Sequence, residues 1–533
     1  MTTTLLFNGR VYSPAMHDAT AMAVRDGTVI WLGSDEVGRS QYPDAELVDL
    51  QGGFVAPAFV DSHVHLTDTG LGLTGLDLRA AGSLEHCLDL VAAHAAAHPD
   101  GLLWGHGWDE SGWPEQRPPS TDELDAVLGG RPAYLARVDV HSAVATSALR
   151  AAVDGLDRLA GYHPQDPLTA AAHHAVRAAA AAGLSAGQRR AAQLAALDHA
   201  AAHGIVAVHE CAGPTIGGLD DWLSLRDLEH GVQVVGYWGQ AVATAAEATE
   251  LLERTGARGL AGDLFVDGAL GSRTAWLREP YSDAPHSCGN SYLDVDAITA
   301  HLHACTEAGI TAGFHVIGDA AVDAVVTALQ QVVDRFGAPA VARCGHRLEH
   351  VEMVDAQQAE RLAGWGVIAS VQPGFDARWG GTEGMYVQRL GPVRAPRLNP
   401  LALLAAQGVP LAFGSDSPVT AMNPWEWVRA AVWHRTAESR LSARAAFAAA
   451  TRGAWRAAGV RDGISGTLVP GAPATYAVWD ADDFEIAIPG SAPEALRWSI
   501  DPRSLVPELP RLAPGEPLPR CRQTVHRGVV IHG

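Results

Sequence analysis

The sequence predicts an α/β fold, a (β/α)8 TIM-like barrel with a small β-domain built from both chain ends. Three observations predict it. Strand-like apolar runs alternate with helical stretches in the middle of the chain, short strand-like runs with turn signals occupy both ends, and histidines and acids recur where the middle strands end. We expect residues 1–57 plus 463–533 to form the β-domain and residues 58–462 to form the barrel with insertions.

Both chain ends read as short strands separated by turns. Residues 4–13 (TLLFNGRVYS), 20–34 (TAMAVRDGTVIWLGS) and 45–57 (AELVDLQGGFVAP) are rich in apolar and β-branched residues, with NG and RDG turn signals between them. The same texture returns in GTLVPGAPATYAVWD (466–480) and TVHRGVVIHG (524–533). We therefore expect the two ends to pair in one domain.

Ten segments of the middle region read as strands, whereas a barrel uses eight, so at least two belong to insertions. In chain order they are FVDSHVH, LLWGHGW, RPAYLARVDVH, GIVAVHECAG, VQVVGYWG, GDLFVDGALGS, ITAGFHVIGDA, HRLEHVEM, GVIASVQP and PLAFGSDSP. The alanine-rich residues 168–203 predict one or two helices broken near Gly183. GLSAG (183–187) matches GxSxG but does not follow a strand, so no serine nucleophile is expected there.

Composition excludes two classes of partner. The chain of 533 residues is 47% hydrophobic, and its formal net charge of −22 argues against nucleic acid or an anionic membrane, which need clustered basic residues. A small-molecule substrate is the expected partner, and a homodimer is left open. The N-terminus MTTTLLFNGRVYS carries no basic segment or long apolar run, so a cytoplasmic location is expected. Six scattered cysteines fit reduced thiols.

Metal-ligand residue types recur at the expected strand ends. In an extended chain the side chains of His63 and His65 point to the same side, which suits chelation. His315, His350 and Asp416 end three later strands. Because barrel enzymes place their chemistry at the carboxyl ends of the strands, this recurrence predicts a site for Zn²⁺, which imidazole and carboxylate ligands suit.

Several motifs resemble a known superfamily. FVDSHVHL, FHVIGD, LEHVE and FGSDSP, with the divided β-domain, resemble the amidohydrolase superfamily. WGHGWDESGWPEQRPPSTDELD, RPAYLARVDVHSA and VDGALGSRTAWL resemble more closely the branch that includes N-substituted formamide deformylases. The resemblance covers nearly the whole chain and implies a metal-bearing barrel. It implies that Asp416 takes a proton from the water that the metal activates and passes it to the leaving group, and His350 is the second candidate catalytic residue. The implied ligands are His63, His65, His315, His350 and Asp416.

The chain departs from this superfamily in having no lysine at all, since its 38 basic residues are all arginine. Many members bridge two metals with a carboxylated lysine. That lysine lies in a segment similar to GDLFVDGAL, at the position where this chain has Asp263. Either a carboxylate replaces the bridge or the site holds one metal. Glu210, which ends a strand, is the favoured bridge, and Asp263, expected at the start of its strand, is the weaker candidate. We expect one Zn²⁺ or a pair bridged by Glu210, and other divalent metals suit the same ligands.

The predicted reaction is the hydrolysis of a C–N bond other than a peptide bond, in an amide or an N-substituted formamide. Trp108 and Trp113 lie in a glycine- and proline-bearing stretch, where they either wall an apolar substrate pocket or anchor the loop. Arg273 either binds the substrate or forms a surface ion pair. The alternatives are a deaminase of a ring amidine, which would release ammonia, and a non-catalytic barrel scaffold. A scaffold needs none of the five ligand-type residues.

Overall fold

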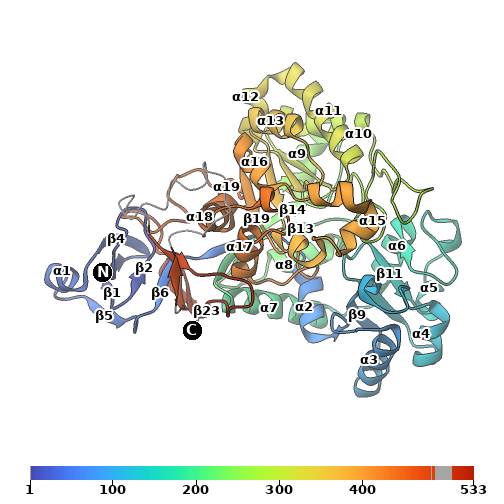
Figure 1. Cartoon of the computed structure of the whole chain (residues 1–533), viewed down its shortest axis with the longest axis horizontal. Helices are drawn as coiled ribbons and strands as arrows, with labels where there is room; N and C mark the ends of the chain where they lie inside the picture. Colours follow the sequence, from blue (N-terminus) through green and yellow to red (C-terminus); the bar gives the residue numbers. More distant parts are fainter. Residues whose placement is uncertain (1, 482, 486–506) are drawn as a thin grey trace.

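The computed structural model describes residues 2–481, 483–485 and 507–533. Within them an eight-stranded sheet occupies the centre of the molecule (Figure 1), and every neighbouring pair in it is parallel. A parallel bridge between Val64 and Ser417 connects the two ends of this sheet. The predicted α/β barrel fold is confirmed. Its strands are β7 (Phe59–Val64), β13 (Ile205–Ala212), β14 (Gln233–Trp238), β15 (Gly259–Leu260), β16 (Thr311–Val316), β17 (Arg347–His350), β18 (Ile368–Val371) and β19 (Leu411–Phe413).

Helices follow the barrel strands and cover the sheet. The sequence of α11 (Asp319–Phe336) explains this packing. Its alanines, valines and leucines recur at helical spacing, so one face of the helix is buried against the barrel. Four helices of the described chain begin with a capping box, in which an N-cap side chain and the side chain three residues later each bond to the other's backbone: α4 (Thr121–Leu128), α7 (Ala186–Ala202), α9 (Ala245–Thr255) and α13 (Ala356–Gly364). Of these, α4 lies in the inserted unit described below. The other helices around the barrel are α8 (Gly218–Arg226), α10 (Val295–Ala308), α11 (Asp319–Phe336), α12 (Ala338–Cys344), α14 (Pro373–Trp379), α15 (Met385–Arg394), α16 (Leu401–Gln407), α17 (Pro424–Val432), α18 (Ala443–Ala448) and α19 (Ala454–Ala457).

An inserted unit separates the first two barrel strands. LLWGHGW and RPAYLARVDVH, two of the ten strand-like segments, form its strands β9 (Leu103–Trp108) and β10 (Ala133–Arg137) instead of barrel strands. Periodicity could not assign them, because a strand buried in an accessory sheet reads like a barrel strand. The unit also contains β8 (Leu76–Asp77), β11 (Ser142–Ala145), β12 (Leu168–Thr169), α3 (Leu84–Ala97) and α5 (Ser147–Arg150), and it follows α2 (Leu66–Thr74).

The alanine-rich segment forms two helices, α6 (Ala170–Ala182) and α7, with the break at Gly183 as predicted. Ser185, the serine of the GxSxG match, caps α7: its hydroxyl accepts a hydrogen bond from the backbone N–H of Gln188. The match therefore marks a helix start and not a nucleophile.

Strands from both chain ends share one sheet beside the barrel, so that the blue and red ends of the chain lie together in Figure 1. β6 (Phe54–Pro57) pairs antiparallel with β20 (Tyr476–Asp480), in the order β2 (Arg10–Val11), β6, β20, β23 (Arg520–His526) and β24 (Val529–His532). A second sheet contains β4 (Thr28–Gly33), β3 (Ala21–Arg25), β1 (Thr3–Phe7) and β5 (Glu46–Asp49), with α1 (Asp35–Gln41) beside it. β21 (Phe484–Glu485) pairs with β22 (Leu509–Pro510). The exact boundaries at Pro57 and Gly463 stay a prediction.

Aromatic side chains join this β-domain to the barrel. The ring of Phe59 in β7 lies 5.0 Å from Trp425 and 5.8 Å from Trp479, centroid to centroid, and all three residues are buried. Large buried aromatic pairs stabilise more than their area alone suggests. The β-domain therefore shares a hydrophobic core with the barrel. No helix in the described part of the chain is both long enough and apolar enough to cross a membrane.

Candidate metal centre

Six side chains from five barrel strands meet at the carboxyl ends of those strands. His63 lies in β7 and His65 directly follows it, His315 lies in β16, and His350 ends β17. Asp263 follows β15 and Asp416 follows β19, each by three residues. Parallel strands end at the same mouth of a barrel, so residues far apart in sequence converge there.

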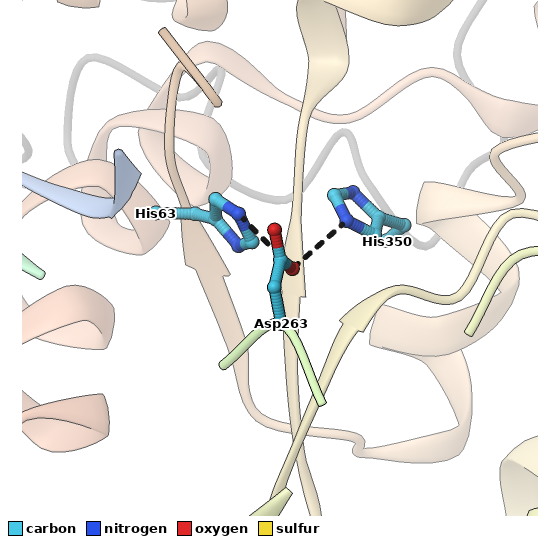
Figure 2. Close-up of side chains that lie close together, drawn as sticks. All are labelled: His63, Asp263 and His350. Atoms are coloured by element: carbon cyan, nitrogen blue, oxygen red, sulfur yellow. Dashed lines mark ion pairs between the residues drawn. The ribbon is translucent and has the colours of Figure 1, made fainter. Parts of the chain in front are cut away.

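Asp263 is the centre of this cluster, and Figure 2 shows its carboxylate between the rings of His63 and His350. Its Oδ1 lies 3.5 Å from His63 Nε2, 3.5 Å from His315 Nδ1 and 3.8 Å from His350 Nε2. Its Oδ2 lies 3.1 Å from His65 Nε2. Asp416 Oδ1 is 3.4 Å from the Nε2 atoms of both His63 and His65. All six side chains therefore direct ligand atoms into one small volume.

Three of the histidines are oriented by an acceptor behind the ring. His63 Nδ1 lies 2.9 Å from Glu349 Oε2, His350 Nδ1 lies 2.8 Å from Gln372 Oε1, and His315 Nε2 lies 3.2 Å from the Gly268 carbonyl oxygen. When the outer nitrogen donates to such an acceptor, the inner nitrogen keeps its lone pair. This arrangement is typical of metal-ligating histidines.

The inner atoms of the cluster test whether a metal fits. His63 Nε2, His315 Nδ1, His350 Nε2 and Asp263 Oδ1 are buried and have no hydrogen-bond partner among the described residues. Buried polar groups are seldom left unpaired, because each loses its interaction with water. A cation between His63, Asp263 and His350 would satisfy three of these atoms, and nitrogen and carboxylate oxygen are donors that Zn²⁺ accepts. Two sets of these residues bring their ligand atoms within 4.8 Å of one another, namely His63, Asp263 and His350, and His63, His65 and Asp416.

The carboxylates of the cluster are held in their charged form. Burial opposes the ionisation of Asp263, yet the imidazole groups of His63, His315 and His350 around it hold its pKa well below the usual value. Burial likewise opposes ionisation of Asp416, but its histidine neighbours lower its pKa. Both groups are thus anionic and suited to bind a cation. Cys211 also approaches His63, but burial raises the pKa of its thiol to about 12, which fits a packed thiol.

Two ligands have strained backbone conformations. His350 has φ of 71° and Asp416 has φ of 52°, in the left-handed region that non-glycine residues seldom adopt. Gly414 lies so close to β7 that a Cβ atom there would be 2.6 Å from the backbone nitrogen of His63. Behind it, Asp61 Oδ1 accepts hydrogen bonds from the backbone N–H groups of His63 (3.1 Å) and Ser415 (2.9 Å). The first and last strands are therefore fixed together where they supply ligands.

The structure places the two bridging candidates differently from what the sequence predicts. Asp263 does not start its strand, because β15 ends at Leu260 and the turn that follows carries Asp263 over the barrel mouth. Glu210 lies in β13, but its Oε2 accepts a hydrogen bond of 2.8 Å from the backbone N–H of Leu66. Burial raises the pKa of Glu210 to about 8. Glu210 is in none of the ligand sets found among the described residues, whereas Asp263 is central.

The structure also does not place the three expected substrate-binding residues on the cavity beside the cluster. Trp108 and Trp113 are buried in the core of the inserted unit, where their indole N–H groups donate to the carbonyl oxygens of Leu135 and Ala81. This is the anchoring role that the sequence left open. Arg273 forms a partly exposed ion pair with Asp283, 2.7 Å away. The sequence alone could not distinguish these roles, loop anchoring for the two tryptophans and an ion pair for Arg273, from contact with a substrate.

Aromatic residues that the sequence reasoning missed line that cavity instead. Phe375 and Trp379 come from α14, which directly follows β18, and Met385 and Tyr386 come from α15. The signal available in the sequence was that these four residues follow the strand-like segment GVIASVQP, close to the end of an expected barrel strand. His141 reaches the cavity from the inserted unit, its ring centroid 4.9 Å from that of His315. The inserted unit therefore contributes part of the cavity wall.

Comparisons with known proteins agree with this geometry. Residues 46–532 match the model of a family described as the amidohydrolase family. Protein LONG AFTER FAR-RED 3 of Arabidopsis thaliana is 28% identical, over 90% of this chain and 88% of its own length. The N-substituted formamide deformylase of Arthrobacter pascens is 24% identical, over 78% of this chain and 81% of its own. The crystal structure of an uncharacterized metal-dependent hydrolase from Pyrococcus furiosus, 27% identical, superimposes with a TM-score of 0.68 and covers 90% of this chain and 99% of that one.

Proposed function

The chain belongs to the amidohydrolase family, and from this membership and the ligand cluster around Asp263 we propose that it hydrolyses a C–N bond other than a peptide bond, in an amide or an N-substituted formamide. The observation that carries the proposal is the set of unpartnered inner atoms on His63, His315, His350 and Asp263. The name of the Arthrobacter pascens relative supports this bond type, because deformylation of a substituted formamide is hydrolysis of such a bond.

A divalent ion held by His63, His65, Asp263, His315, His350 and Asp416 would lower the pKa of water and polarise the substrate carbonyl. The protein's own contribution to the chemistry is proton transfer. Asp416 lines the cavity, and its pKa is lowered despite burial, so its carboxylate is available as a base. Asp416 accepts the proton of the attacking water and then delivers it to the leaving nitrogen. His350 lines the same cavity, and its Nε2 is available to the metal.

The Asp263 carboxylate takes the place that a carboxylated lysine would otherwise fill. Its two oxygens face different histidines, Oδ1 towards His63 and Oδ2 towards His65, so one residue can bind two ions or hold one ion between both groups. An aspartate side chain is shorter than a carboxylated lysine, but the turn after β15 brings it close to the cluster. We propose Asp263, and not Glu210, as the bridging or shared carboxylate.

Metal content and product analysis test the proposal. Purified protein should contain one or two equivalents of zinc or another divalent ion by elemental mass spectrometry. Incubation with formanilides and acetanilides should release an acid and an aniline, with activity lost on chelation. An Asp416→Asn variant that keeps its metal should lose most turnover, by a factor of about 100 or more. Ammonia released from ring amidines, with no turnover of any amide, would favour a deaminase, and metal-free protein would contradict both.

A further inference from the structure

The cavity beside the metal centre is apolar on the side away from the ligands. Phe375 and Trp379 pack with ring centroids 5.3 Å apart, and Trp379 lies 6.4 Å from Tyr386. Met385, Leu270 and Val419 add aliphatic surface. Such a wall binds an apolar or aromatic substituent, because pockets for small ligands are mainly apolar with a few directing polar groups.

One carboxylate in this cavity has an acceptor atom to spare. Glu352 is buried and lines the cavity, and its Oε2 accepts a hydrogen bond of 2.7 Å from the Tyr386 hydroxyl and one of 3.5 Å from Asn399 Nδ2. No described residue donates to its Oε1. Asp139, the other non-ligand carboxylate on the wall, is occupied by Arg137 at 2.8 Å and by the Ser272 hydroxyl at 2.8 Å. Glu352 is therefore the free acceptor.

None of the described residues that line the cavity is an arginine, and the chain has no lysine. Two arginines that bond residues of the lining are already paired. Arg137 bonds Asp109, Glu110 and Asp139, while Arg389 bonds Glu110, Asp283 and the Gly271 carbonyl oxygen. A substrate carboxylate beyond the scissile bond would thus meet Glu352 and aromatic rings without a cationic partner, which is strongly unfavourable in a buried site.

On the proposed hydrolytic function, we infer that the substrate is an amide whose substituent is apolar or aromatic and carries a hydrogen-bond donor for Glu352, and that carboxylate-bearing amides are rejected. Glu352 acts on selectivity and takes no part in bond cleavage. The aromatic wall holds the substituent, and Glu352 fixes its orientation through the donor.

Entry of such a substituent requires movement of the wall. The cavity has a volume of about 30 Å³, room for about two water molecules, so an aromatic ring does not fit the present arrangement. Phe375 and Trp379 lie on α14, and Met385 and Tyr386 lie on α15. Residues 380–384 (GGTEG) join these two helices, and Gly381 has φ of 86°, which glycine adopts without strain. This connection lets the two helices separate to admit the ring.

The test uses three formanilides that differ only in the para substituent, which is aminomethyl, methyl or carboxylate. With the zinc-loaded wild type we expect kcat/KM for the aminomethyl probe to exceed that for the methyl probe about tenfold, as one hydrogen bond allows, and the carboxylate probe to be slowest. Glu352→Met should abolish the aminomethyl preference while changing turnover of the methyl probe less than threefold. Glu352→Gln, which keeps an acceptor oxygen, should retain part of it.

Tyr386→Phe is the matched control, because it removes the internal hydrogen bond to Oε2 and leaves Oε1 in place. Tyr386→Phe should keep the preference for the aminomethyl probe. The Glu352 variants should have a metal content and an unfolding midpoint within the range measured for Tyr386→Phe. A carboxylate probe that is fastest, or a preference unchanged in Glu352→Met, would overturn the inference. If no probe is hydrolysed, the proposed function fails for these amides. Equilibrium dialysis of the same three probes then tests the inference alone, since the order of affinities should follow the same pattern.

Discussion

His63 and Glu349 form a fully buried pair at the candidate metal centre, with His63 Nδ1 2.9 Å from Glu349 Oε2. Glu349 is in turn bound by Arg347, whose Nε lies 2.5 Å from Oε1 and whose Nη2 lies 2.9 Å from Oε2. Burial disfavours a charged Glu349, but Arg347 and His63 hold its pKa below the usual range. The carboxylate therefore stays ionised, keeps the proton on Nδ1 of His63 and leaves Nε2 free for a metal.

Loss of the Glu349 carboxylate should weaken metal binding without removing a ligand. We expect Glu349→Gln to lower metal affinity about 10-fold and Glu349→Leu about 100-fold, the range found for partners of ligating histidines. Competition with a chromogenic chelator measures this. Unfolding in denaturant should show a loss of about 3–5 kcal/mol, because Arg347 remains buried without its partner. Glu123→Gln, at an exposed helix start, is the control and should leave metal affinity unchanged. Wild-type affinity in a folded Glu349→Leu protein would contradict this account.

Asp263 and Glu210 should respond differently to loss of charge. Asp263→Asn should reduce the bound metal by at least one equivalent, because Asp263 Oδ1 and Oδ2 face the histidines directly. Glu210→Gln should leave metal content unchanged, because its carboxyl group serves the Leu66 backbone N–H. Elemental mass spectrometry of the two purified variants decides. Metal lost from Glu210→Gln and kept in Asp263→Asn would restore Glu210 as the bridge.

Reconstitution should need metal alone. The chain contains no lysine, so no carbamate has to form from carbon dioxide. After removal of the metal with a chelator, zinc in degassed, bicarbonate-free buffer should restore the same metal content and the same turnover of formanilide as zinc with added bicarbonate. Recovery that depends on bicarbonate would show that carbonate itself completes the site.

Arg137 should be essential for stability. It is buried and bonds three carboxylates, Asp109 at 2.9 Å, Glu110 at 2.9 Å and Asp139 at 2.8 Å. Arg137→Met leaves these acids buried without their cation, so we expect the free energy of unfolding to fall by about 3–5 kcal/mol. Arg117→Met, which breaks an exposed pair with Glu123, should cost less than about 1 kcal/mol. Equal losses in the two variants would contradict the importance of burial.

Substitution of a tryptophan in the inserted unit should change stability, whereas substitution of a tryptophan in the cavity wall should change substrate affinity. Trp108→Phe removes the donor to the Leu135 carbonyl and should lower the free energy of unfolding by about 1–3 kcal/mol with KM unchanged. Trp379→Leu removes a ring from the cavity wall and should raise KM for formanilide several-fold. Chemical denaturation and steady-state kinetics on both variants test this. A raised KM in Trp108→Phe alone would return Trp108 to the substrate site.

The sequence by itself determined the barrel, the pairing of the two chain ends and the ligand types, because each leaves a local pattern. Alternation of strand and helix predicts a parallel barrel, and the carboxyl ends of its strands must share one mouth, so His63, His65, His315, His350 and Asp416 could be grouped without coordinates. The break of the alanine-rich segment at Gly183 was also local, since the helix restarts at the capping serine Ser185.

The tertiary structure alone showed which carboxylate lies within the histidine cluster and which aromatic rings line the cavity beside it. Asp263 reaches the cluster because β15 is only two residues long and the chain then turns over the barrel mouth, a geometry that no residue pattern encodes. Nothing in the sequence distinguishes the roles of Trp108 and Trp379. In the structure Trp108 lies in the core of the inserted unit, whereas Trp379 lies in the cavity wall. Burial and partners depend on segments far away along the chain, so the same side chain becomes an anchor or a contact according to what packs against it.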